Sequence, residues 1–148
     1  MSDEPLSLAL RALGRKERTV AEMGSWLRAR GVGDNEVEEV VDQLVSTGVL
    51  DDTRYAQRYA EDKRELKRWG SERIRAALLD RGIGEEDIAE ALGSDGGEAE
   101  IDQAVQVLRE RGETLADALE RQRALGLLAR RGYDSETAYE AIRRARHP

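Results

Sequence analysis

The chain has 148 residues, of which 37% are charged and only 4% aromatic, and its net charge is −7. It contains no Cys, which excludes a disulfide framework and a thiolate metal site and leads us to expect the reducing cytoplasm. The negative charge argues against a general nucleic-acid binder, because phosphate neutralisation dominates such affinity, and no stretch is apolar enough to span a bilayer.

Residues 1–50 predict a first repeat unit of three helices. An apolar-rich helix should cover residues 6–13 and end at Gly14. Thr19 and Glu22 have the capping-box spacing, in which each side chain satisfies a backbone N–H at the start of the next helix. The expected apolar face of that helix consists of Val20, Met23 and Leu27.

The second helix should end at Gly31, because glycine readily takes the left-handed conformation that closes a helix. Asp34 or Asn35 is expected to cap the third helix, which Gly48 should end. Its apolar residues recur at i, i+3, i+4 and i+7, as one buried helical face requires: Val37, Val40, Val41 and Leu44.

Residues 51–92 predict a second repeat unit, which begins at Asp51 and Asp52. Consecutive acids at a helix start indicate capping and not a metal or acid/base pair, and Asp52 is the expected N-cap. The buried stripe of this helix should consist of Tyr55, Ala56, Tyr59 and Ala60. A second helix should run from Ser71 to Gly82, and a short third one should close the unit with Ile88, Ala91 and Leu92.

Residues 93–97 predict a flexible linker, which we expect to act as a hinge because three of its five residues are glycine. Residues 98–148 predict a third repeat unit. Its first helix should bury Ile101, Ala104, Val105 and Leu108. Its second helix should begin near Thr114, with Leu115, Leu119, Leu125 and Leu128 on its apolar face. Asp134 is the expected cap of the last helix.

One short phrase, Leu-x-x-Arg-Gly, closes a helix in each unit. Its glycines are Gly31, Gly82 and Gly132, spaced 51 and 50 residues apart, and all three are predicted to end helices with positive φ. A period of this size indicates a repeated helical unit, and such repeats usually present a surface to a large partner. The sequence therefore predicts an all-α protein of nine helices in three groups.

Two further stretches carry a resemblance to a known family. The first comprises Gly48, Leu50, Asp51, Asp52, Tyr55 and Ala56. The second is Trp69-Gly70 shortly before the middle Leu-x-x-Arg-Gly phrase. In this order and spacing, over roughly residues 10–145, the chain resembles the RecX regulatory proteins. The resemblance implies an all-α fold of three tandem three-helix repeats that form an elongated, curved body.

The resemblance also implies a function in DNA repair, recombination and the SOS response. RecX proteins modulate the RecA recombinase, usually as inhibitors of its ATPase, strand-exchange and coprotease activities. They lie in the groove of the RecA filament on single-stranded DNA and bridge neighbouring protomers. The resemblance therefore implies RecA as the partner of a monomeric chain, with at most weak contact to single-stranded DNA.

Eight basic residues are candidate partner contacts: Lys63, Lys67, Arg68, Arg73, Arg130, Arg131, Arg143 and Arg144. The first four belong to a basic run over residues 54–73, which can also be read as a solvated helix face with local pairs such as Arg58 with Asp62 and Glu65 with Arg68. The other four lie in residues 121–148, where seven Arg face three acids. Trp69 either closes a turn or forms an exposed anchor.

No catalytic constellation is present in the sequence. There is no nucleophile with a base at suitable spacing, no metal-ligand cluster and no nucleotide motif, and the only His, His147, is the penultimate residue. We therefore expect neither an enzyme nor a bound cofactor or metal.

Two other functions stay open. Residues 19–56 alone could form a helix-turn-helix of a DNA-binding regulator. Against this hypothesis, the presumed reading helix has no basic residue and would repel phosphate through Glu36, Glu38, Glu39 and Asp42. A helical protein-interaction scaffold is the third possibility.

Overall fold

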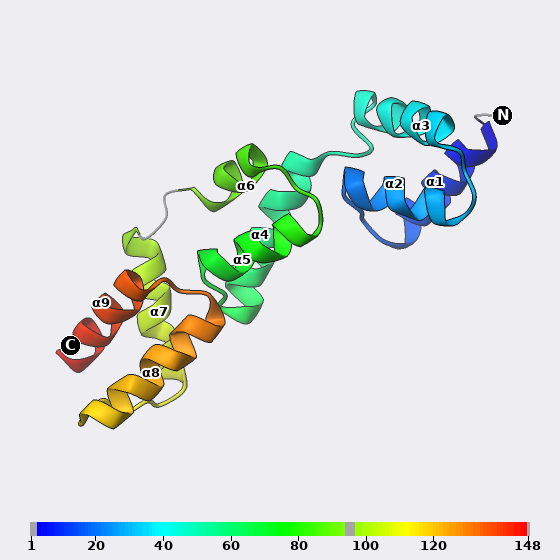
Figure 1. Ribbon diagram of the computed structural model, residues 1–148. Helices are drawn as coiled ribbons and strands as arrows, with labels where there is room; N and C mark the ends of the chain where they lie inside the picture. The colour runs from blue at the N-terminus through cyan, green and yellow to red at the C-terminus, as the bar shows by residue number, and fades with distance from the viewer. Residues whose placement is uncertain (1–2, 94–96, 148) are drawn as a thin grey trace. The chain divides into compact units, whose positions relative to one another are not determined.

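The computed structural model describes residues 3–93 and 97–147, and within them the chain is all-α (Figure 1). Over these residues it has nine helices and no strand, as the sequence predicts. The first unit predicted from sequence contains α1 (Asp3–Arg15), α2 (Val20–Ala29) and α3 (Asp34–Ser46). The second contains α4 (Asp52–Lys67), α5 (Ser71–Asp80) and α6 (Glu85–Leu92). The third contains α7 (Glu98–Glu110), α8 (Ala118–Arg131) and α9 (Ser135–Arg146).

The chain forms two compact bodies. Unit 1 comprises Met1–Arg58 and Leu78–Ala91, and unit 2 comprises Tyr59–Ala77 and Leu92–Pro148. The division passes through α4 and α5, so each of these helices contributes residues to both units. Of the linker expected at residues 93–97, residues 94–96 lie outside the described part of the chain. None of the described helices is long and apolar enough to cross a bilayer.

The core of the first three helices forms as their periodicity predicts. Met23 and Leu27 of α2 are buried against Val37 and Leu44 of α3 and against the small residues of α1. The capping box of α2 is confirmed. The Thr19 hydroxyl accepts the Glu22 N–H, and the Glu22 carboxylate accepts the Thr19 N–H, each at 3.0 Å. Two local bonds therefore fix where α2 begins.

Two predicted helix boundaries in this region are wrong. Helix α1 does not end at Gly14 but continues to Arg15, because one exposed glycine weakens a helix without stopping it. Neither Asp34 nor Asn35 caps α3, since Gly33 is the N-cap and makes no side-chain capping bond. The Asp34 carboxylate accepts a hydrogen bond from Arg28 Nε at 3.0 Å instead.

Asp51 and Asp52 have different roles: one caps α4, and the other contacts α2. Asp51, not Asp52, caps α4, because its Oδ1 accepts the Arg54 N–H at 3.0 Å. Asp52 Oδ1 accepts the Val20 N–H at 2.9 Å and so satisfies the first turn of α2. Burial is the largest influence on Asp52, and it raises the pKa of this carboxyl. The second aspartate is therefore a tertiary contact within unit 1.

Replacing Asp52 by Asn should leave the protein at least as stable at neutral pH. The Asn oxygen still accepts the Val20 N–H, while the charge that burial disfavours is removed. Because the folded-state pKa is raised, the penalty of that charge disappears as pH falls through it, so the two proteins should converge in acid. Asp52→Ala should be less stable than Asp52→Asn by about 1 kcal/mol at all pH values, because the Val20 N–H loses its acceptor and neither variant carries the charge. Urea denaturation at several pH values measures both, and a less stable Asn variant at neutral pH would contradict the assignment.

The core of the last three helices lies within unit 2. Helix α7 packs against both α8 and α9, and Ala104, Leu108 and Leu128 are fully buried there. The predicted cap of α9 is confirmed, because Asp134 Oδ1 accepts the Thr137 N–H at 2.7 Å.

The predicted start of α8 is wrong. The helix begins at Ala118, four residues after Thr114, and Asp117 caps it by accepting the Glu120 N–H at 2.8 Å. Leu119 consequently lies on the outer side of the first turn and is 61% exposed. The buried face is instead formed by Ala124, Leu127 and Leu128, with Leu115 and Leu125 packed at its edge.

The three repeat glycines all have positive φ, as predicted: 84° at Gly31, 82° at Gly82 and 99° at Gly132. Their surroundings nevertheless differ. A side chain at Gly31 would meet no atom within 4 Å, whereas one at Gly82 would overlap the Ala21 side chain. At Gly132 it would overlap the main chain of Arg73. The glycines thus share one backbone requirement but not one packing requirement.

A candidate basic docking surface

The turn between α4 and α5 meets the turn between α8 and α9 through backbone atoms, within unit 2. The Gly70 N–H donates to the Arg131 carbonyl at 2.8 Å, and the Glu72 N–H donates to the Gly132 carbonyl at 3.0 Å. A Cβ atom at Gly70 would overlap the Gly132 carbonyl group. Glycine is therefore needed at both positions, so that the two chains can approach this closely.

Three side chains bind three consecutive main-chain carbonyls of the α4–α5 turn. Arg131 Nη1 donates a hydrogen bond to the Lys67 carbonyl oxygen at 3.1 Å. Tyr133 Oη donates to the Arg68 carbonyl oxygen at 2.8 Å. Gln103 Nε2 donates to the Trp69 carbonyl oxygen at 2.9 Å. We call Gln103, Arg131 and Tyr133 the carbonyl clamp. Arg68 has a φ of 56° and is the only non-glycine residue with positive φ among those described. The clamp holds this residue in a conformation that an L side chain disfavours.

The centre of the clamp is Tyr133, whose side chain is only 3% exposed. Burial raises the pKa of its phenol to about 12, so the hydroxyl keeps the proton that it donates. Gln103 Nε2 also donates to Tyr133 Oη at 2.7 Å. Next to it, Glu100 accepts both the N–H and the hydroxyl of Ser71, at 2.6 and 2.7 Å, and thereby caps α5.

Tyr133→Phe should reduce the stability of the protein by about 1–3 kcal/mol, because the Arg68 carbonyl loses its donor in a buried environment. Tyr139→Phe is the matched control. Tyr139 is 63% exposed, so removal of its hydroxyl should change stability by less than about 0.5 kcal/mol. Thermal unfolding of the two variants measures the difference, and equal losses would contradict the role of the clamp.

Six of the eight candidate basic residues come together around this junction. They are Lys63, Lys67, Arg68, Arg73, Arg130 and Arg131, which we call the basic junction. Lys63 Nζ lies 4.8 Å and Arg73 Cζ 4.0 Å from the centroid of the Trp69 ring. Arg73 Nη1 also donates to the Arg130 carbonyl at 3.2 Å. Residues 57 positions apart in the chain thus contribute to one surface.

The side chains of the basic junction differ in how they are paired. Arg68 forms an ion pair with Glu110 at 3.0 Å, and Arg131 is engaged by the Lys67 carbonyl. The exposed side chains of Lys67 and Arg130, by contrast, form no ion pair or hydrogen bond with any residue that the structure describes. Leu66 lies next to Lys67 in the chain and is 77% exposed. Two unpaired cations and one exposed apolar side chain are therefore available to a partner.

Trp69 closes a turn, which is the first of the two roles that the sequence leaves open. Its backbone N–H donates a hydrogen bond to the Lys63 carbonyl at 3.1 Å and so closes the end of α4. Its half-buried ring meets Tyr59 edge-on, with the centroids 6.4 Å apart, between the two cations described above. Cations within about 6 Å of a ring face are attracted by its quadrupole. Trp69 consequently holds Lys63 and Arg73 in place.

The local pairs expected along α4 are not those that form. Arg58 pairs with Glu17 of unit 1 at 2.9 Å, not with Asp62. Arg68 pairs with Glu110, 42 positions away, instead of Glu65. A solvated helix face with pairs in local register is therefore a wrong description of these two arginines.

Arg143 and Arg144 lie at the end of α9 and are engaged within the molecule. Arg144 donates to both carboxylate oxygens of Glu98, at 2.7 and 2.8 Å, and to Glu140 at 2.9 Å. Arg143 also pairs with Glu140. Hydrogen bonds first from Arg143 and then from Arg144 lower the pKa of the Glu140 carboxyl to about 2. The pair of Arg144 with Glu98 joins α9 to α7, and the pairs with Glu140 lie within α9, so both arginines differ from the unpaired cations of the basic junction.

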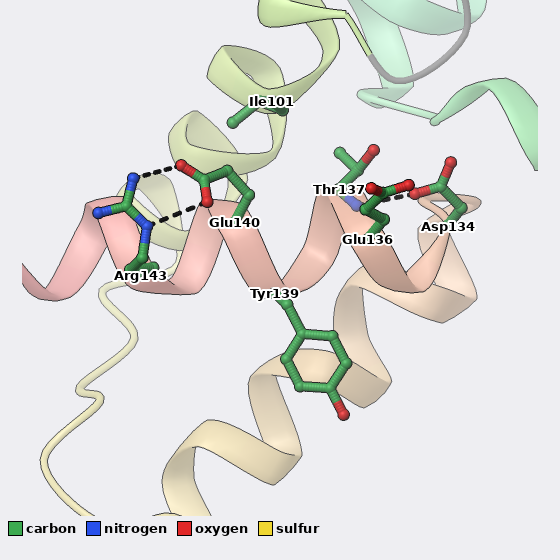
Figure 2. A pocket seen from close by; sticks show the side chains of 7 residues that line it. All are labelled: Ile101, Asp134, Glu136, Thr137, Tyr139, Glu140 and Arg143. Carbon is green, nitrogen blue, oxygen red and sulfur yellow. Dashed lines mark hydrogen bonds and ion pairs between the residues drawn. The ribbon is translucent and has the colours of Figure 1, made fainter.

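A hollow of about 740 Å³ lies beside α9 (Figure 2). In it Glu140 faces Arg143, Asp134 accepts the Thr137 N–H, and Tyr139 points away from the other labelled side chains. Two of the three acids that line the hollow, Asp134 and Glu140, are thus occupied by structural bonds. Among the described residues, no group of three or more His, Asp or Glu side chains could hold a metal ion.

Charge is distributed unevenly between the two units. Acidic and basic side chains are equal in number over the residues of unit 2, so the net charge of −7 belongs to unit 1. The basic junction therefore lies in the neutral unit, where repulsion of an acidic partner is weaker than at unit 1.

Comparison with known proteins agrees with this architecture. The model of the RecX first three-helix domain matches residues 6–44, and that of the second three-helix domain matches residues 51–92. Among solved structures, RecX from Lactobacillus salivarius superposes with a TM-score of 0.87 at 19% identity, covering 98% of this chain and 96% of that one. A second crystal structure, of a regulatory protein RecX, gives 0.81 at 25% identity and covers 97% and 71% of the two chains.

Two relatives are also similar in sequence over most of their length. Regulatory protein RecX of Thermus thermophilus is 36% identical over 145 residues, which cover 98% of this chain and 94% of the relative. Regulatory protein RecX of Mycobacterium avium is 34% identical over 144 residues, which cover 95% and 83%. Two RecX domain models match in order along the chain, and the relatives match over nearly its whole length. The protein therefore belongs to the RecX family of regulatory proteins.

Proposed function

We propose that this RecX protein regulates a RecA recombinase by binding its filament on single-stranded DNA. Inhibition of the ATPase, recombinase and coprotease activities is the proposed effect. Family membership supports the regulatory role. The basic junction is the observation that supports a particular binding surface. The proposed mode is binding by a monomer in the cytoplasm, without catalysis, cofactor or metal.

Lys67 and Arg130 are the proposed principal contacts, because their charges are exposed and unpaired among the described residues. Acidic or polar groups of a RecA protomer would receive them, and Leu66 would supply apolar contact beside Lys67. Arg68 and Arg131 would act through the position of the turn, since they already have partners. Arg143 and Arg144 stay candidate contacts that would have to exchange their present carboxylate partners.

Binding would affect the ATPase through filament geometry. ATP is bound between neighbouring protomers of the filament, so a ligand that contacts more than one protomer favours one relative rotation of them. Such a ligand shifts the equilibrium between filament states by its difference in affinity for the two states. We propose that successive helical repeats of the chain make these contacts.

The steady-state ATPase of RecA from the same organism, on single-stranded DNA, tests the proposal. Titration with this protein should inhibit turnover in a dose-dependent way at ratios up to one protein per RecA protomer. Electron microscopy of the same samples should separate filament disassembly from inhibition along intact filaments. Unchanged turnover with folded protein and intact filaments would refute the proposal.

The helix-turn-helix hypothesis has no support from the described surface of α3. Glu38, Glu39 and Asp42 are exposed on this helix, which has no basic residue. A helix that enters a DNA groove needs donors and positive charge toward the phosphates. Contact with single-stranded DNA is proposed only as a weak secondary interaction of the basic junction.

A further inference from the structure

A second surface, separate from the basic junction, lies on unit 1 between α2 and α3. It is a groove of about 460 Å³. Its apolar lining includes Val20 of α2 with Val37 and Val41 of α3, and Gly24 leaves its α2 wall without a side chain. Its charged lining consists of Arg28 and Asp34, which pair with each other, and of Glu38 and Asp42. Apolar side chains are thus combined with a net acidic lining, because Asp34, Glu38 and Asp42 outnumber Arg28.

The sequence of α3 arranges these residues in two parallel rows. Apolar side chains recur four residues apart at Val37, Val41 and Val45, and acids recur with the same spacing at Asp34, Glu38 and Asp42. Residues four apart follow one another along one side of a helix. Each row is about 12 Å long, because a helix rises 1.5 Å per residue. That length corresponds to about two turns of a docked helix.

The charge of the acidic row is not neutralised within the described chain. Asp34 pairs with Arg28, but Glu38 and Asp42 form no ion pair or hydrogen bond with a described residue. Both are exposed, and α3 itself contains no basic residue. Since unit 1 also holds the whole negative net charge of the protein, this groove complements a cationic partner.

We propose that the groove between α2 and α3 docks a helical segment of a partner protein that carries apolar side chains beside Lys or Arg. The apolar side chains would enter between Val20 and Val41, and the cations would pair with Glu38 and Asp42. Recognition of an amphipathic helix by a hydrophobic groove is a recurrent binding mode. The net negative charge of the groove would repel the phosphates of a nucleic acid, so we do not expect it to bind one. This inference is independent of the proposed action on RecA.

The test uses the full chain and a synthetic helical peptide of Leu and Lys, about 18 residues long, with Leu at helical spacing on one face. Fluorescence anisotropy should show salt-sensitive binding of this peptide. A peptide of the same composition in scrambled order should bind at least about tenfold more weakly, because its leucines cannot enter the groove together. A Leu and Glu peptide should not bind.

Charge reversal identifies the site. The double change Glu38→Lys and Asp42→Lys should weaken peptide binding at least about tenfold, because both cation partners are replaced by like charges. The control is Glu86→Lys with Glu90→Lys on α6, which is also in unit 1. The control has the same net change of charge and the same four-residue spacing, and its residues are also exposed. It should change affinity less than about threefold.

Gly24→Leu tests the apolar lining without altering charge. A Cβ at this position lies 3.3 Å from Arg28 Nη1, a movable tip, and 3.8 Å from Val37 Cγ1. The helix should tolerate the change, since Leu has a higher helix propensity than Gly. The variant should therefore fold and yet bind the peptide several times more weakly, because its side chain occupies the groove.

Three results would overturn the proposal. The first is equal binding of the ordered and scrambled peptides, and the second is an equal loss in the α6 control, since either would mean general attraction to an acidic unit. The third is self-association of the protein, in sedimentation without peptide, that the groove variant abolishes, because the occupant would then be a second copy. None of these readouts uses RecA, so their failure and that of the proposed function are distinguishable.

Discussion

Gly132→Val should cost the protein roughly 2–5 kcal/mol of folding free energy, the largest loss expected at any of the repeat glycines. About 1–2 kcal/mol follows from placing an L residue in the left-handed region, where Gly132 has a φ of 99°. A further 1–3 kcal/mol or so follows from overpacking. The new side chain would overlap Arg73, whose main-chain N lies only 2.6 Å from the Cβ position. A loss of this size is a large fraction of the stability of a small protein.

Gly31→Val is the matched control, because it makes the same substitution at a similar φ. No atom lies within 4 Å of the new Cβ at Gly31, so only the conformational cost of about 1–2 kcal/mol is expected. Gly82→Val should fall between the two, since the new Cβ would overlap one atom, the Cβ of Ala21, and not the main-chain N as well, as it does at Arg73. Urea denaturation followed by circular dichroism ranks the three. Indistinguishable losses would show that the contact between the two turns of unit 2 is not as close as described.

Reversal of the two unpaired charges of the basic junction should weaken binding to the RecA filament by roughly 10–100-fold. The variant combines Lys67→Glu with Arg130→Glu, and each change replaces an attraction to an acidic or polar acceptor by a repulsion. Added salt should weaken the unmodified protein but affect the variant much less, because screening acts on the attraction that the variant lacks. The concentration that half-inhibits the RecA ATPase measures the effect.

The control for this variant is Arg109→Glu with Arg123→Glu. Both residues are exposed in unit 2 and lie outside the basic junction, and the net change of charge is the same. Half-inhibition should move less than about threefold, as expected for a general electrostatic effect alone. An equal loss in the two variants would assign binding to overall charge and would reject the basic junction as the contact surface.

Local interactions explain which parts of the fold are readable in the sequence. The capping box at Thr19 and Glu22, the cap at Asp134 and the positive φ of Gly132 each depend on residues within one or two turns. The spacing of apolar residues likewise reports one helix at a time. These three predictions are confirmed, whereas the end of α1 and the caps of α3 and α4, which are equally local, are wrong. The wrong start of α8 arises because Leu115 precedes the helix and Leu119 is exposed in its first turn, although both continue the apolar pattern.

The basic junction could be predicted only as a list of charges. Nothing near Arg68 in the sequence indicates a positive φ, because the tyrosine that stabilises it is 65 positions away. Gly70 reads as a turn residue, although its necessity comes from the approach of Gly132. In the same way, Arg144 and Lys67 look equivalent in the sequence, and only the fold pairs Arg144 with Glu98, 46 positions away. Whether a charge is available to a partner is a tertiary property.

The carbonyl clamp has a consequence for how this surface can change during evolution or by design. Gln103, Arg131 and Tyr133 bind main-chain oxygens, which every amino acid possesses. The exposed side chains of Leu66 and Lys67 are therefore not part of the attachment, although they lie where the attached turn begins. Substitution there alters what the turn offers to a partner while the bonds that hold it stay the same. The residues that hold the turn in place are thus different from the residues that would contact a partner. A new binding specificity could be selected at these positions without a change of fold.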